Sequence, residues 1–124
     1  MTVPALDASS AAALRADLEG WSVDAVGELL GDRATRALGR EQVLPALVAA
    51  RANGDRRAVV TRLLMLGDQV ARAEVDAAFA RIGSEGLERA GLVVTQGQGG
   101  YDAVRATVDL RPYAAAVETG QVDW

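Results

Sequence analysis

Arginine side chains are the residues in this sequence whose type and spacing best fit a binding chemistry. A guanidinium binds a carboxylate or a phosphate through two parallel hydrogen bonds, which a lysine ammonium does not do. All 13 cationic residues are arginine, and residues 33–62 hold seven of them against two acidic residues. The sequence therefore predicts a basic patch that contacts RNA or an acidic protein, formed by Arg33, Arg36, Arg40, Arg51, Arg56 and Arg57.

The spacing of these arginines predicts two groups. Arg33, Arg36 and Arg40 stand at i, i+3 and i+7, which places three side chains on one face of a helix. The other three flank the helix break at residues 53–54. Acidic residues adjoin both groups, so a solvated, ion-paired surface is the alternative interpretation. No aromatic residue lies between Arg33 and Arg62, so the sequence gives no support for base stacking there.

Catalytic machinery is incomplete in this sequence. The chain has no cysteine and no histidine, which excludes disulfides, zinc thiolates, cysteine nucleophiles and a Ser-His-Asp triad. Without histidine, the chain also lacks the side chain that most often acts as a general base. Glu85 and Glu88 fall close together, but Arg89 is beside them, and no calcium-loop spacing occurs. We therefore predict no catalytic residue, no cofactor-binding residue and no metal site in this segment.

The elements that position these residues are mainly helical. A length of 124 residues predicts one domain. Apolar residues at helical spacing, separated by glycines, predict helices over residues 9–19, 23–30, 32–38, 41–52, 56–66, 71–82 and 85–90. The period then changes to two, which predicts a hairpin of strands 92–95 and 101–110. The interpretation is a mainly α fold, in which an N-terminal helical cluster precedes a winged-helix-like half of three helices plus a C-terminal β-hairpin.

The predicted boundaries follow from this order. Residues 1–113 form a single domain, its winged-helix half covers about residues 55–113, and residues 114–124 form a linker. Trp21 is predicted to lie in the core. The glycine-rich run Gly97–Gly100 is interpreted as the hairpin turn. It opens a strand rather than a helix and lacks the last glycine of a dinucleotide-binding fingerprint.

A winged helix also suggests DNA binding, with the helix before the hairpin in the major groove. That helix carries Glu85 and Glu88 against Arg89, and the predicted turn holds no cation. Since DNA affinity comes largely from phosphate neutralisation, this half favours a structural or protein-binding role. A stand-alone winged-helix DNA-binding regulator and a dimerisation or interaction module remain the alternatives.

The location of the chain is predicted from its apolar runs. The longest run covers residues 43–50 and includes Pro45, whereas a membrane span needs roughly 20 residues. No positive residue precedes Asp7, so no signal peptide is predicted. We expect a soluble, cytoplasmic protein without a membrane partner. The absence of lysine, with abundant alanine, valine and glycine, indicates a high-GC bacterial coding bias.

Several segments, spread over nearly the whole chain, carry a family resemblance: Leu14–Leu18, Ser22–Gly31, Arg62–Gly67, Glu85–Val93, Val104–Tyr113 and the closing Asp123-Trp124. They resemble the N-terminal domain of class I S-adenosylmethionine-dependent methyltransferases from high-GC Gram-positive bacteria. In that family a Rossmann-like catalytic domain follows, similar to the HemK and small-subunit rRNA methyltransferases. That domain carries an acidic glycine-rich cofactor loop and an Asn-Pro-Pro-aromatic motif, and neither motif occurs in this sequence.

The resemblance implies a non-catalytic substrate-recognition or docking domain of a methyltransferase that acts on RNA or protein. S-adenosylmethionine would be bound by the C-terminal methyltransferase domain, which would be the partner of this segment. Residues 114–124 would lead toward that domain. The identity of the acceptor and the formation of a homodimer remain open.

Overall fold

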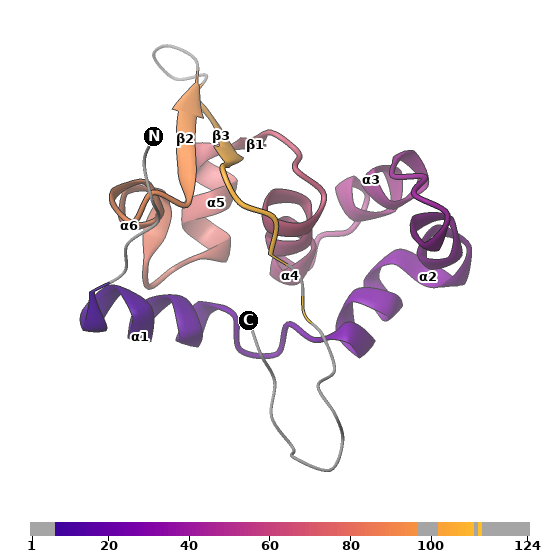
Figure 1. Cartoon of the computed structure of the whole chain (residues 1–124), viewed down its shortest axis with the longest axis horizontal. Coiled ribbons are helices and arrows are strands. Elements are labelled where there is room, and N and C mark those ends of the chain that lie inside the picture. Colours follow the sequence, from indigo (N-terminus) through magenta and orange to yellow (C-terminus); the bar gives the residue numbers. More distant parts are fainter. Residues whose placement is uncertain (1–6, 97–101, 111, 113–124) are drawn as a thin grey trace.

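The computed structural model describes residues 7–96, 102–110 and 112. The N-terminal helical cluster consists of α1 (Ala8–Asp17), α2 (Val23–Gly39) and α3 (Leu44–Arg51), and the winged-helix-like half begins with α4 (Arg56–Val60) and the π-helical turn η1 (Thr61–Met65). The remaining elements are β1 (Val70–Ala71), α5 (Arg72–Ala78), α6 (Gly83–Arg89), β2 (Val93–Gln96) and β3 (Ala103–Ala106). Figure 1 shows α2 and α3 at one end of the molecule and α6 with the hairpin at the other. The predicted mainly α fold is confirmed.

A kink at Gly31 divides α2 into two halves, which correspond to the two helices predicted over residues 23–30 and 32–38. Ser22 starts the helix, because its Oγ accepts a hydrogen bond from the backbone N–H of Ala25 at 3.1 Å. Gly31 has φ 82° and ψ 165°, a conformation that a residue with a Cβ rarely adopts. In the second half, Ala34 and Ala37 are buried, and α2 packs against α3.

The sheet is three-stranded and antiparallel, with the strand order β1-β3-β2. Val104 of β3 pairs with Val70 on one side and Thr95 on the other. The predicted hairpin is confirmed, but its second strand is shorter than residues 101–110. The chain leaves the sheet after Ala106, and Leu110 donates a backbone hydrogen bond to the Leu64 carbonyl at 2.9 Å. Residues 97–101, which include the predicted Gly97–Gly100 turn, lie outside the described part.

Two predicted helices differ from the structure. The helix predicted over residues 71–82 is wrong at both ends, because residues 70–71 pair with β3 and α5 ends at Ala78. The helix predicted over residues 56–66 changes to a π-helical turn at Thr61. The Thr61 hydroxyl donates to the Arg57 carbonyl four residues earlier at 2.8 Å, a contact that disturbs regular helices.

The core surrounds α4 and η1, as the wide apolar stripe of that segment predicts. Val60, Leu63 and Leu64 are buried there, with Phe79 at the end of α5 and Leu87 of α6. Trp21 is also in the core, as predicted. Within the described residues, no helix is both long enough and apolar enough to cross a membrane.

Candidate functional site

Three of the predicted arginines lie together on the second half of α2. Arg33, Arg36 and the C-cap residue Arg40 are all exposed, whereas Ala34 and Ala37 of the same helix are buried. The shared face predicted from their spacing is therefore present. Within the described residues, none of the three guanidiniums makes a hydrogen bond or ion pair. This arginine face presents three positive charges to whatever contacts that end of the molecule.

The other three predicted arginines are engaged inside the chain. Arg51 binds Asp68 through two hydrogen bonds of 3.0 and 2.7 Å. Arg57 binds Asp55 in the same manner, at 3.1 and 2.8 Å. Arg56 donates instead to backbone carbonyl oxygens, those of residues 17, 19 and 78, at 2.7, 3.0 and 3.2 Å respectively. The six arginines are therefore not one free patch, and the ion-paired interpretation describes Arg51 and Arg57.

Arg56 connects two helix ends. The carbonyls of Asp17 and Ala78 belong to the last residues of α1 and α5, where backbone oxygens lack partners within their own helix. One guanidinium supplies donors to both ends and also to the Glu19 carbonyl. This side chain therefore joins the N-terminal helical cluster to the winged-helix-like half.

A buried ion-pair network surrounds Asp68, whose side chain is 7% exposed. Its carboxylate accepts hydrogen bonds from Arg51 and also from Arg62 Nε at 3.0 Å. Burial by itself raises the pKa of Asp68, but the hydrogen bonds and charges of Arg51 and Arg62 together outweigh burial and lower it. The hydrogen bonds from Arg57 lower the pKa of Asp55 to about 2. Both carboxylates therefore stay ionised well into the acidic range.

We expect the protein to lose stability as the pH falls from about 4 toward about 2. A carboxyl whose pKa is lowered by folding stabilises the folded state above its unfolded pKa of about 3.9, and this stabilisation is lost as the pH falls through the folded pKa. Asp68→Asn should lower the free energy of unfolding at neutral pH by about 2 kcal/mol, because the amide has one acceptor oxygen in place of two and no charge to pair with Arg51 and Arg62. It should also flatten the acid dependence. Urea unfolding across this range measures both, and equal acid slopes for the two proteins would contradict the assignment.

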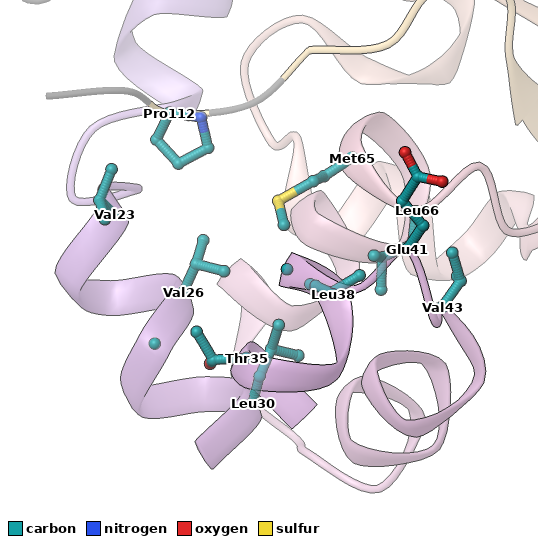
Figure 2. A pocket seen from close by; sticks show the side chains of 12 residues that line it. Val23, Val26, Leu30, Thr35, Leu38, Glu41, Val43, Met65, Leu66 and Pro112 are labelled. Atoms are coloured by element: carbon teal, nitrogen blue, oxygen red, sulfur yellow. The ribbon is translucent and has the colours of Figure 1, made fainter. Parts of the chain in front are cut away.

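A groove of about 530 Å³ lies between the two halves of α2 and η1. Thr35 and Glu41 are its lining residues with polar side chains, and the apolar ones are Val23, Val26, Leu30, Leu38, Val43, Met65, Leu66 and Pro112. Figure 2 shows Val23 and Val26 on one side of this groove, with Leu38 and Met65 across from them. Sequence reasoning missed the groove. The one sequence signal that relates to the groove is Gly31, which predicts a helix end at the point where α2 bends.

A second polar network, also missed, holds the winged-helix-like half together. Arg72, the first residue of α5, donates to Thr95 Oγ1 at 2.9 Å and to Ser84 Oγ at 3.3 Å. Carboxylate oxygens of Glu88 and Asp102 each lie 3.6 Å from its guanidinium. This arginine therefore contacts α6, β2 and the start of β3. Within the described part of the chain, no group of three or more side chains is arranged to hold a metal ion.

Comparison with known proteins places most of the chain in one family. A family model described as a domain of unknown function (DUF7059) matches residues 18–107. The matched region includes the arginine face, the three strands and every lining residue of the groove except Pro112. No curated protein and no solved structure matches the sequence.

Proposed function

We propose that this chain, which belongs to the DUF7059 family of domains of unknown function, is a non-catalytic recognition module of an S-adenosylmethionine-dependent methyltransferase acting on RNA or protein. The observation that carries the recognition role is the arginine face formed by Arg33, Arg36 and Arg40. These exposed guanidiniums have no partner within the described residues. An anionic acceptor would neutralise them and would be guided to this end of the molecule.

The methyltransferase part of the proposal is supported by the sequence resemblance in segments such as 22–31 and 104–113. In such an enzyme the catalytic domain binds S-adenosylmethionine and orients its methyl group. A separate helical module adds surface for a large acceptor. The arginine face of α2 would supply that surface, and the catalytic domain would be the partner of this module.

A DNA-binding regulator is the second candidate, because the strand order β1-β3-β2 fits a winged helix. The charge of α6 opposes it. Glu85 and Glu88 are exposed on this helix beside the exposed Arg89, and Glu88 also accepts a hydrogen bond from Thr95 at 2.8 Å. A helix with this balance repels phosphates, so a regulator of this kind would need a second basic surface formed by dimerisation.

The test is the double charge reversal Arg36→Glu with Arg40→Glu. At low salt we expect the wild-type chain to bind an anionic probe, either a single-stranded RNA of about 20 nucleotides or a glutamate-rich peptide. The double variant should lose about tenfold or more in affinity, which corresponds to roughly 1.4 kcal/mol. Fluorescence anisotropy at several salt concentrations measures the loss.

Arg105→Glu is the matched control for this experiment. Arg105 is exposed on β3, which Figure 1 shows apart from α2, and it has no hydrogen bond or ion pair within the described residues. Its reversal changes the net charge in the same direction, and we expect a change of less than about twofold. Unchanged affinity in the double variant, or an equal loss in the control, would overturn the role of the arginine face.

A further inference from the structure

We infer that the groove between α2 and η1 is a docking site for an amphipathic helix of a partner protein. Apolar side chains of that helix would enter the groove, and a lysine or arginine beside them would meet Glu41. This inference goes beyond the proposed function, because it concerns a different surface from the arginine face and a partner of opposite charge.

The apolar surface at this groove extends beyond the groove itself. Val23 and Val43 line it and are 48% and 40% exposed. Directly after Val43 in the chain, Leu44 and Val48 of α3, one helical turn apart, are 67% and 60% exposed. Large exposed apolar side chains that gather near a groove are typical of interaction sites in soluble proteins. Their presence along α3 fits a helical segment with several apolar side chains better than it fits a small molecule.

The backbone keeps the groove open. The kink at Gly31 separates the two helix halves that form its walls, and η1 contributes Met65 through a π-helical turn. Glu41 has φ 61°, a left-handed conformation that is uncommon for a residue with a side chain. Its N–H donates to the Leu38 carbonyl at 2.9 Å. Irregular backbone features of this kind cluster at functional sites, and three of them meet here.

The charge of the groove selects the partner. Glu41 is the one charged residue among those that line it in the described part of the chain, and its exposed carboxylate has no hydrogen bond or ion pair there. Asp24, next to Val23, is also exposed, and its carboxylate has no hydrogen bond or ion pair within the described residues. Arg33, Arg36 and Arg40 do not line the groove, although Arg40 stands between the lining residues Gly39 and Glu41, and Arg36 is three residues before Gly39. A cation is therefore the complementary charge at the groove.

Two capped alanine-based peptides test the inference. Both carry leucines at i, i+4 and i+7, and one has lysines where the other has glutamates. We expect the lysine peptide to bind the full chain roughly fivefold or more tightly than the glutamate peptide. It should also shift the methyl NMR signals of Val26, Leu38 and Met65. Equal affinities, or methyl signals that do not move, would overturn the inference.

Variants locate the binding. Glu41→Gln should reduce the preference for lysine to less than about twofold. Gly27→Leu should weaken binding about tenfold by filling the groove, since Gly27 lines it and a Cβ there would meet nothing within 4 Å. The double variant Leu44→Ser with Val48→Ser should also weaken binding about tenfold. Both positions are exposed, so we expect these substitutions to change the free energy of unfolding little.

The same titration separates this inference from the proposed function. The Arg36→Glu and Arg40→Glu variant should bind the lysine peptide at least as tightly as wild type, because neither arginine lines the groove and the reversal adds negative charge beside Glu41. If that variant loses the lysine peptide while Gly27→Leu and the serine variant keep it, the groove is not the docking site. If the Arg36→Glu and Arg40→Glu variant binds the anionic probes as tightly as wild type, the proposed function fails. The peptide results at the groove are not affected by that outcome.

Discussion

Replacing Trp21 with alanine is expected to lower the free energy of unfolding by about 3–5 kcal/mol. Trp21 belongs to the segment that connects α1 to α2, and its indole is buried in the core that includes residues of α4 and η1. Its Nε1–H donates to Thr61 Oγ1 at 3.0 Å, so the substitution leaves both a cavity and a buried hydroxyl without its donor. Small domains have total stabilities of about 5–15 kcal/mol, so this loss should be visible directly in urea unfolding followed by circular dichroism.

Two substitutions at Thr61 separate packing from hydrogen bonding. Thr61→Val keeps the volume but removes the acceptor for Trp21 and the donor to the Arg57 carbonyl, and should cost roughly 1–2 kcal/mol. Thr61→Ser keeps the hydroxyl, so we expect a smaller loss from the missing methyl group alone. A Trp21→Ala loss below about 1 kcal/mol would show that the indole is not the core residue described here.

Asp17→Ala is expected to cost about 3 kcal/mol by disconnecting α1 from the segment before α6. The buried Asp17 carboxylate accepts hydrogen bonds from the backbone N–H groups of Arg81, at 3.1 Å to each oxygen, and of Ile82, at 2.8 Å. These donors are 64 and 65 residues away in the chain. Without the carboxylate, buried donors lose their acceptor and helix α1 loses its connection to the winged-helix-like half.

Asp17→Asn and Asp24→Ala are the comparisons for this experiment. The amide side chain introduced by Asp17→Asn keeps one oxygen acceptor, so that variant should lose less than Asp17→Ala. Asp24 is exposed in the first turn of α2, where it interacts with the helix dipole, and its removal should cost no more than about 1 kcal/mol. Equal losses for Asp17→Ala and Asp24→Ala in urea unfolding would contradict the role given to the Asp17 carboxylate.

Local sequence signals predicted the parts of the fold that depend on neighbouring residues. Ser22 marked the start of α2, Gly31 its interruption, and the spacing of Val60, Leu63 and Leu64 the central buried segment. Strand β1 could not be predicted, because two residues show no alternation and their partners lie more than 30 residues later. The π-helical turn could not be predicted either, because the apolar spacing of an ordinary helix continues through Leu66, and the hydrogen bond from the Thr61 hydroxyl to the Arg57 carbonyl is seen only in the structure.

The candidate site also has one part that local spacing predicted and another that depends on the tertiary fold. The shared face of Arg33, Arg36 and Arg40 follows from helical spacing, so the sequence predicted it. The carbonyl partners of Arg56 are 22 to 39 residues away, and only the tertiary fold brings them within reach. The groove was missed for the same reason, since its walls come from both sides of a kink and from a π-helical turn.

The coding DNA past the codon for Trp124 tests the proposed function most directly. We predict that the reading frame continues into a domain with an acidic glycine-rich cofactor loop and an Asn-Pro-Pro-aromatic motif, which would bind S-adenosylmethionine. A stop codon directly after Trp124, or a following domain without these motifs, would contradict the assignment to a methyltransferase. A stand-alone binding module would then be the better description of this chain.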